Sequence, residues 1–203
     1  MRIGVIDYGA GNLFSILACL KRLGFGVEVF DHSGSFQSDV DALILPGVGA
    51  YSVGMSELRS RGLIEPIRDF SSSQRPLVGI CLGAQLLFQS SSEFGETLGL
   101  GLIPGHVASL SSLGFLPPTI GWRQVSWTSD TSLSEFESSW FYFVHSYHMV
   151  ADNDSVVIGE ALGSSMSYAA AVKVGSVFGF QFHPEKSGSA GSNLLGKVLR
   201  REH

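Results

Sequence analysis

The first half of the sequence alternates short apolar runs with helical segments, and this alternation constrains the fold more than any other feature. The runs RIGVID, VEVF, ALIL and PLVGI predict four buried strands. After the first run, Asn12 can cap a helix that continues to about Leu23 and stops at Gly24. Between the last two runs, VGMSELRSRGLIEPIRDF predicts helical structure interrupted by Gly62 and Pro66. Strands that alternate with helices form a parallel sheet with helices on both faces.

The second half is poorer in helix. The runs WRQVSWT, WFYFVHSY, SVVIGEAL, YAAAVKVG and VFGFQFH predict strands that alternate in polarity and are typical of antiparallel pairing, before a final helix from about Gly191 to Arg200. The predicted fold class is therefore α/β, with a central, mostly parallel sheet flanked by helices and an antiparallel extension in the second half. The 203 residues contain 44% hydrophobic residues and no clear linker, so we expect a single domain over residues 1–203.

Composition argues against several classes of partner. The net charge is −5 and the sequence has no basic cluster, so we expect no binding to nucleic acid or to an anionic membrane surface. The first residues lack the apolar core of a signal peptide, and apolar runs nowhere reach about 18 residues, so we expect a cytoplasmic protein. Of its two cysteines, Cys19 falls on the apolar face of a predicted helix and is expected to pack there, with no disulfide to Cys81.

Cys81 lies in GICLG, where an apolar strand ends and a helical segment follows. Gly79 and Gly83 leave room for a tight strand-to-helix turn of the kind that lifts a nucleophile above the edge of a sheet. A helix predicted over residues 84–89 would place its N-terminus beside the sulfur and favour the thiolate. A buried cysteine that only fills space is the alternative. The two flanking glycines favour the nucleophile.

A cysteine nucleophile needs a base, and His183 is the best placed of the six histidines because it ends the apolar run FGFQFHPE. Pro184 favours an extended backbone at His183, which would put Glu185 on the same side of the chain. A carboxylate there can hold one ring nitrogen and leave the other for Cys81, which is the arrangement of a catalytic triad.

The remaining histidines have simpler explanations. His145 and His148 suggest a metal pair, but no third ligand has convincing spacing, so we expect neither a metal nor a cofactor. His32, His106 and His203 are expected to be solvated.

An acyl-transfer site also needs hydrogen-bond donors for the developing oxyanion. The N–H of Leu82, directly after the nucleophile, is one candidate. Another is an N–H of Val48 or Gly49 in the turn PGVG, which follows the neighbouring strand. An ordinary strand-to-helix connection also explains this turn.

With GICLGAQLLF, PGVGAY and FGFQFHPEKSG, the chain resembles the class I (triad) glutamine amidotransferases over nearly its whole length. With DYGAGNL, GLGLIPGHV, YFVHSYH and HPEKSG, it resembles more narrowly the glutaminase subunit of imidazole glycerol phosphate synthase. The resemblance implies that Cys81 attacks the side-chain amide of L-glutamine, that His183 transfers protons and that Glu185 orients His183. It implies glutamate and ammonia as products.

The resemblance also implies further site residues. Gln85 matches a position that contacts bound glutamine, and the segment His145, Ser146 and Tyr147 matches one that surrounds its amino-acid end. Asn12 and Lys186 match positions at the interface with a (β/α)₈-barrel cyclase subunit, which receives the ammonia and uses it in histidine biosynthesis.

One segment departs from the family pattern and leaves an alternative open. In LPPTIGWRQV, Thr119 and Ile120 stand where a histidine is usual, and Arg123 replaces an asparagine, although Trp122 is kept. A changed segment here is compatible with a paralogue that feeds a different synthase, such as one that builds amidino or amino sugars.

Other classes of function are also possible from the sequence. The strand RIGVID followed by Gly9 and Gly11, with Asp31 after the next strand, is typical of dinucleotide-binding folds, but Phe14 occupies the position of the third glycine. A cysteine hydrolase or peptidase would keep the same turn around Cys81. A docking subunit without activity would keep the triad only by inheritance.

Overall fold

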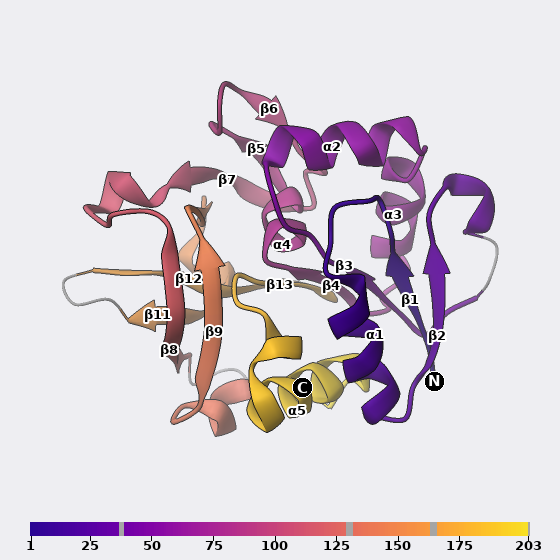
Figure 1. The fold of residues 1–203 in the computed structure, drawn as a ribbon. Coiled ribbons are helices and arrows are strands. Elements are labelled where there is room, and N and C mark those ends of the chain that lie inside the picture. The colour runs from indigo at the N-terminus through magenta and orange to yellow at the C-terminus, as the bar shows by residue number, and fades with distance from the viewer. Residues whose placement is uncertain (37–38, 129–131, 163–165, 203) are drawn as a thin grey trace.

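The computed structural model describes residues 1–36, 39–128, 132–162 and 166–202. Over these residues the strands form one mixed sheet with the order β2-β1-β3-β4-β13-β12-β10-β7-β5-β6, to which β11, β8 and β9 are joined through β12. The first five strands of this order are mutually parallel and form the centre of the molecule in Figure 1. They are β2 (Gly26–Phe30), β1 (Arg2–Ile6), β3 (Ala42–Leu45), β4 (Leu77–Ile80) and β13 (Val177–Phe180).

Helices cover both faces of this parallel part (Figure 1). One face carries α1 (Leu13–Arg22) and α5 (Gly188–Leu199), and the other carries α2 (Tyr51–Ser60), α3 (Ile64–Ser71) and the short α4 (Leu82–Leu86).

The central strands supply the core on both faces because successive strand residues point to opposite sides. In β3 and β4, Ile44 and Val78 pack with α1 and α5, whereas Leu43 and Leu77 pack with α2, α3 and α4. All four side chains are 0% exposed. The predicted parallel sheet with helices on both faces is confirmed.

The second half forms the antiparallel extension that the sequence predicts. β12 (Ser167–Val174) pairs antiparallel with β13, with β10 (Tyr147–Ala151) and with β11 (Val157–Leu162). β11 continues to β8 (Thr119–Trp127) and then to β9 (Trp140–His145). Five short 3₁₀ turns complete the described elements: η1 (Ser33–Ser35), η2 (Leu110–Leu113), η3 (Ser132–Phe136), η4 (Asp154–Val156) and η5 (Pro184–Lys186).

Several predicted boundaries were wrong. The helix after Cys81 ends at Leu86, and the next residues form β5 (Phe88–Ser91), which pairs with β6 (Thr97–Leu98) and β7 (Ile103–Ser109). The carbonyls of Leu86 and Leu87 accept hydrogen bonds from the N–H groups of Leu100 and Leu102, so long-range pairing overrides local helix propensity. No strand was predicted for β5, β6 or β7.

Other corrections follow from turn chemistry. Pro66 lies in the first turn of α3, where a helix does not need the N–H that proline lacks, so only Gly62 (φ +66°) separates α2 from α3. Ser146 divides the predicted single strand WFYFVHSY into β9 and β10, and the final helix begins at Gly188.

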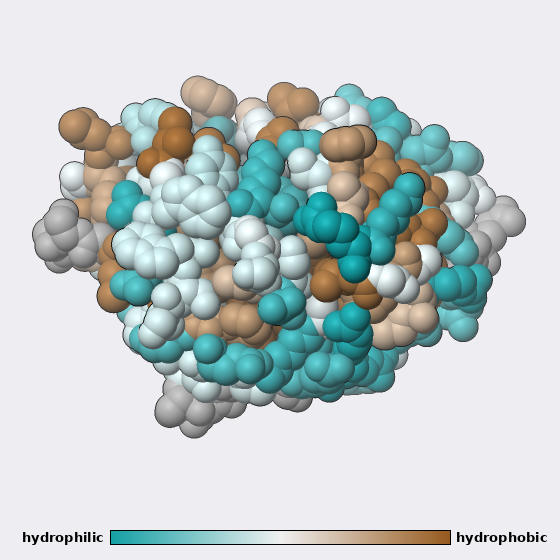
Figure 2. All heavy atoms as spheres, turned by 60° about the horizontal axis from the view of Figure 1, so that its bottom comes forward, coloured by the Kyte–Doolittle hydropathy of each residue, from teal (hydrophilic) through white to brown (hydrophobic). Residues whose placement is uncertain are grey.

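Among the described residues, no helix is long and apolar enough to cross a membrane. The face that Figure 2 presents mixes hydrophilic and hydrophobic side chains.

Candidate active site

The pairing of β4 with β13 brings the candidate catalytic residues together. Ile80 lies opposite Phe180 in a parallel register, so the residues that follow both strands emerge at the same edge of the sheet. Cys81 comes directly after β4, and His183 follows shortly after β13. Ligands of parallel sheets bind beyond this carboxyl edge.

Cys81 occupies a strained turn between β4 and α4, with φ +53° and ψ −111°. A Cβ on Gly79 would lie 2.7 Å from the Cα of Ala84, and a Cβ on Gly83 would lie 1.8 Å from the carbonyl oxygen of Leu45. Both positions therefore need glycine, because the strand, the turn and α4 approach one another too closely for a side chain. Such backbone strain costs on the order of 1–3 kcal/mol and persists where the surroundings enforce it.

His183 and Glu185 form a buried pair. The ring Nδ1 of His183 lies 2.9 Å from Oε1 of Glu185, and the two side chains are 3% and 1% exposed. The carboxylate accepts the hydrogen of Nδ1, which leaves Nε2 as the ring nitrogen available for proton transfer. Backbone hydrogen bonds fix the segment, because the His183 N–H donates to Tyr142 and the Ser187 hydroxyl donates to the His183 carbonyl.

The backbone reason for this pairing differs from the predicted one. His183 itself is extended (φ −100°, ψ 93°), but Pro184–Lys186 form the 3₁₀ turn η5. The turn, rather than the alternation of an extended strand, carries the Glu185 carboxylate back to the imidazole.

Cys81 also affects the pKa of His183. Burial lowers the pKa of His183, but Cys81 and Glu185 outweigh it and raise that pKa to about 9. Within the described part of the chain, the buried Nε2 atom makes no hydrogen bond of ordinary length, and the Cys81 sulfur lies 3.8 Å from the Val144 carbonyl oxygen. With this raised pKa the imidazole is protonated at neutral pH and lies beside the Cys81 sulfur.

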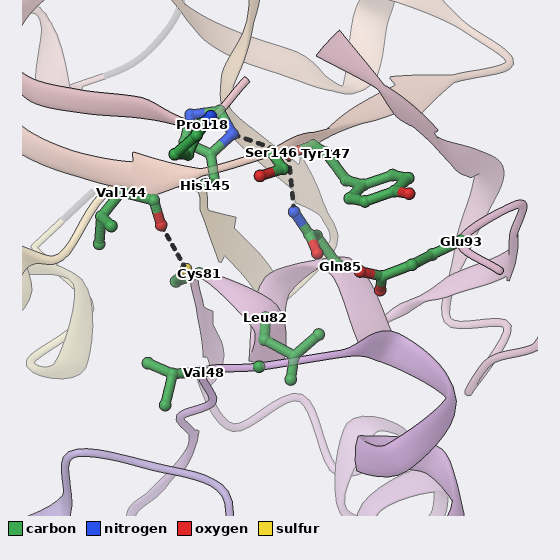
Figure 3. A pocket seen from close by; sticks show the side chains of 11 residues that line it. Val48, Cys81, Leu82, Gln85, Glu93, Pro118, Val144, His145, Ser146 and Tyr147 are labelled. Carbon is green, nitrogen blue, oxygen red and sulfur yellow. Dashed lines mark hydrogen bonds between the residues drawn. The ribbon is translucent and has the colours of Figure 1, made fainter. Parts of the chain in front are cut away.

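A pocket of about 280 Å³ opens above Cys81 (Figure 3). Its lining combines the candidate nucleophile, both predicted oxyanion segments and all four predicted substrate residues: Val48, Gly49, Cys81, Leu82, Gln85, Glu93, Pro118, Val144, His145, Ser146 and Tyr147.

The predicted substrate residues play different structural parts. Gln85 is 5% exposed, and its side-chain nitrogen donates to the Tyr147 carbonyl at 2.9 Å and to Oε1 of Gln181 at 3.0 Å. His145 uses both ring nitrogens, with Nδ1 at 2.7 Å from the Tyr147 carbonyl and Nε2 at 3.2 Å from the Tyr168 hydroxyl. Burial lowers the pKa of His145 to about 4, so the ring is neutral and supports the wall of the pocket.

Glu93 lines the pocket and was missed from the sequence. One of its carboxylate oxygens accepts a hydrogen bond from the N–H of Tyr51, the first residue of α2, at 2.6 Å. The sequence pattern predicts no helix or strand for the segment SSSEF around it. Its glutamate reaches the pocket only because β5 pairs with β6 and β7, and local sequence carries no signal for that pairing.

Both predicted oxyanion segments are present, but the N–H donors of Leu82 and Val48 are occupied. The N–H of Leu82 donates to the Gly47 carbonyl at 3.3 Å, and the N–H of Val48 donates to the Ala10 carbonyl at 3.0 Å. The peptide between Gly47 and Val48 therefore presents its carbonyl to the nucleophile turn and directs its N–H away. In this conformation, neither the Leu82 nor the Val48 donor is free to bind an oxyanion.

The predicted interface residues lie close to the catalytic edge. Asn12 is exposed and caps α1 by accepting the Ser15 N–H at 3.4 Å, while Lys186 is half-buried in η5, which contacts both α1 and β9. The departing segment of residues 119–123 begins β8, where Trp122 is 51% exposed and packs its ring edge against Tyr142 of β9.

Other predicted features have the following placement. Cys19 is fully buried, and both cysteines are free. Phe14, which takes the place of the third glycine of a dinucleotide motif, is 82% exposed on α1. His32 and His106 are exposed, as expected. In the described part of the chain, no three His, Cys, Asp or Glu side chains gather as metal ligands.

The chain is similar in sequence or in fold to several known proteins. The family model for class I glutamine amidotransferases matches residues 4–200. The imidazole glycerol phosphate synthase subunit HisH of Moorella thermoacetica is 43% identical, with 98% of this chain and 95% of the relative covered. The HisH subunit of Aquifex aeolicus is 40% identical, with 99% and 97% covered. The structure of PurLQS from Thermotoga maritima has a similar fold, with a TM-score of 0.79, 21% identity, and 100% of this chain and 99% of that chain covered.

The chain therefore belongs to the class I glutamine amidotransferases and, within them, to the family of the HisH subunits of imidazole glycerol phosphate synthase.

Proposed function

We propose that this chain is the glutaminase subunit of an imidazole glycerol phosphate synthase and hydrolyses L-glutamine through Cys81, His183 and Glu185. The observation that carries the proposal is the buried His183–Glu185 pair behind Cys81, at the edge where β4 and β13 end. Relatives about 40% identical over nearly the whole chain bear the HisH name, which favours this partner over a synthase of amidino or amino sugars.

The geometry supports a two-stage acyl transfer. The Cys81 thiolate attacks the amide carbon of glutamine, and the carbonyl electron pair moves to oxygen. The imidazolium of His183 then protonates the amide nitrogen, the C–N bond breaks and ammonia leaves. Water, deprotonated by His183, attacks the thioester and releases glutamate, which regenerates the sulfur nucleophile. Glu185 holds the His183 ring in the required tautomer throughout.

The pocket offers recognition for the amino-acid end of glutamine. Both Gln85 nitrogen donors are used by the protein, so the Gln85 oxygen is the polar atom left to face a ligand. Figure 3 shows the Glu93 carboxylate pointing toward Gln85. These two acceptors suit the α-ammonium group, and Ser146 and Tyr147 line the pocket beside Gln85.

Oxyanion stabilisation is assigned to the N–H groups of Leu82 and of Val48 or Gly49, after the peptide between Gly47 and Val48 has turned over. This assignment keeps the predicted donors and adds a conformational step, because the Leu82 and Val48 donors are occupied in the structure.

Ammonia passes to a partner subunit, which we propose to be a (β/α)₈-barrel cyclase. In bulk water at neutral pH, most ammonia would become ammonium, which is not a nucleophile, so transfer across an interface preserves it. Asn12, Lys186 and Trp122 lie on adjoining elements around the catalytic edge and are the residues assigned to that interface. We expect residues 1–203 to act as one domain in the cytoplasm, in keeping with the two free cysteines.

The test is glutamate production from L-glutamine by the chain alone and with the cyclase subunit and its nucleotide ligand. Strong stimulation by the cyclase supports both the chemistry and the partner. Without stimulation, but with Cys81 labelled by an electrophilic glutamine analogue, another synthase is the partner. The absence of both would refute the proposal.

Two cysteine variants give a matched comparison. Cys81→Ser should abolish synthesis from glutamine and leave synthesis from added ammonium salts intact. Cys19→Ser, at a buried cysteine whose sulfur lies 3.5 Å from the Ser192 hydroxyl, should retain both activities. Loss of both activities in Cys81→Ser would point to a structural role for this residue.

A further inference from the structure

Behind the pocket wall, Gln181 is 0% exposed and lies between β13 and His183. Its side-chain oxygen accepts a hydrogen bond from the Gln85 amide at 3.0 Å. Its own side-chain nitrogen is buried without a hydrogen-bond partner among the described residues. The proposed mechanism leaves Gln181 without a role.

The direction of each hydrogen bond around Gln85 follows from one backbone carbonyl. The Tyr147 carbonyl can only accept, so the Gln85 atom 2.9 Å away must be the amide nitrogen. The second hydrogen of that nitrogen is directed at Gln181, whose facing atom must then be its oxygen. The Gln85 oxygen consequently faces the pocket, as Figure 3 shows.

The same carbonyl is held from the other side. His145 Nδ1 donates to it at 2.7 Å, and the Tyr168 hydroxyl lies 3.2 Å from His145 Nε2, where it serves as the donor to a neutral imidazole. Tyr168 is 3% exposed. A continuous hydrogen-bond network therefore runs from β12 through the β9–β10 junction to α4 and β13.

A glutamine at the fully buried position 181 has a cost in stability. A fully buried amide whose nitrogen has no partner loses the solvation of that nitrogen, and an apolar side chain of similar shape would avoid this cost. Among the described residues, the Gln181 side chain makes one hydrogen bond, which its oxygen accepts from the Gln85 amide. A residue retained at a cost to stability indicates a functional requirement.

We propose that Gln181 is a positioning residue for substrate recognition, which locks the Gln85 amide with its oxygen toward the pocket and so selects ligands that carry an α-ammonium group. This inference rests on the proposed glutaminase function. Without Gln181, the Tyr147 carbonyl is the one partner among the described residues that still holds the Gln85 amide, so the Gln85 oxygen is directed at the pocket less firmly.

The experiment compares L-glutamine with its α-deamino analogue, glutaramate, as substrates of the cyclase complex. Gln181→Met keeps the shape of the side chain and removes the acceptor. We expect it to raise KM for glutamine about tenfold, the equivalent of one hydrogen bond to a charged group, with little change in kcat. The kcat/KM for glutaramate should change less than twofold.

Two further variants separate positioning from a general structural role. Gln181→Glu retains an oxygen acceptor and should recover most of the preference for glutamine. Gln89→Met removes a hydrogen bond of similar kind, from the Gly105 N–H at 3.1 Å, on the exposed side of β5, and should leave both substrates unaffected.

The outcomes distinguish the two proposals. If Gln181→Met lowers kcat/KM equally for both substrates, or leaves the preference for glutamine intact, the positioning role is wrong. If wild-type protein releases no glutamate and its Cys81 is not labelled by an electrophilic glutamine analogue, the proposed function itself fails. Unchanged alkylation of Cys81 by iodoacetamide in Gln181→Met confirms that the nucleophile is intact in this variant.

Discussion

Glu185→Gln tests the charged part of the candidate triad most directly. The substitution keeps the size of the side chain but removes the carboxylate that lies 2.9 Å from His183 Nδ1. Glu185 raises the pKa of His183 both through this hydrogen bond and through its charge. The pKa of His183 should therefore fall from about 9 in the variant.

The size and sign of the stability effect follow from linkage. The pKa of His183 is about 9 in the folded state and 6.5 by reference in the unfolded state. A folded pKa above the unfolded one contributes stability that is fully present below pH 6.5 and is lost as the pH rises through 9. From about pH 7.5 to about pH 9.5, wild-type protein should lose about 2 kcal/mol of unfolding free energy from this one group. Glu185→Gln should lose clearly less over the same interval.

The assay is urea denaturation at several pH values, followed by circular dichroism. Glu57→Gln is the matched control, since it removes a carboxylate from a partly exposed ion pair with Arg61 and should keep the wild-type pH dependence. If the unfolding free energies of wild type and Glu185→Gln fall in parallel as the pH rises, Glu185 does not raise the pKa of His183 and the reasoning is refuted. In the complex, Glu185→Gln should also lower kcat by about 10²–10⁴, because the tautomer of His183 is no longer held, while binding of the partner persists. Wild-type turnover would remove the orienting role.

Three further outcomes are expected. Gly47→Ala should destabilise the protein by about 1–3 kcal/mol in urea denaturation, because the new Cβ would lie 2.1 Å from the Tyr8 hydroxyl oxygen. Adding Tyr8→Phe should recover part of this loss. If Tyr8→Phe leaves the effect of Gly47→Ala unchanged, the clash with Tyr8 is not its cause. Saturation with the cyclase should raise kcat of glutamine hydrolysis more than it lowers KM, since oxyanion donors act in the transition state, and a change in KM alone in steady-state kinetics would contradict the closed-donor reasoning. Lys186→Ala should weaken binding of the cyclase in titration calorimetry and leave labelling of Cys81 by a glutamine analogue unchanged; unaltered affinity would remove Lys186 from the interface.

The features that sequence predicts well are those that depend on local pattern. The alternation of apolar runs and helical segments predicts the parallel sheet, because each buried strand is too apolar to face water on either side. Gly79 and Gly83 predict the tight turn at Cys81, because only glycine permits contacts of 2.7 Å and 1.8 Å at the position of a Cβ.

Features that depend on long-range pairing could not be predicted in this way. The residues of β5 have helix-forming neighbours, and their pairing with β6 and β7 makes them a strand. Glu93 enters the pocket through that pairing, so its place depends on contacts that no local pattern encodes. The contact between His183 and Glu185 was predicted correctly, but from an extended backbone. In the structure, the 3₁₀ turn at Pro184–Lys186 produces this contact.

The orientation of the Gly47–Val48 peptide could not be predicted from the sequence. The same residues allow this peptide to direct either its carbonyl or its N–H at the nucleophile turn. In the structure, the nucleophile and base are assembled, whereas the peptide holds the Leu82 and Val48 donors closed by two backbone hydrogen bonds. Each such bond contributes about 0.5–1.5 kcal/mol net, so turning the peptide costs roughly 1–3 kcal/mol before any ligand helps. One of the two acceptors, the Ala10 carbonyl, lies two residues before Asn12, which caps α1 at the proposed interface. If the proposed cyclase binds at Asn12, we expect it to act on the segment that keeps the Val48 N–H turned away. A partner that binds the turned-over peptide more tightly by about this energy would shift the equilibrium and couple glutamine hydrolysis to the presence of the subunit that consumes the ammonia.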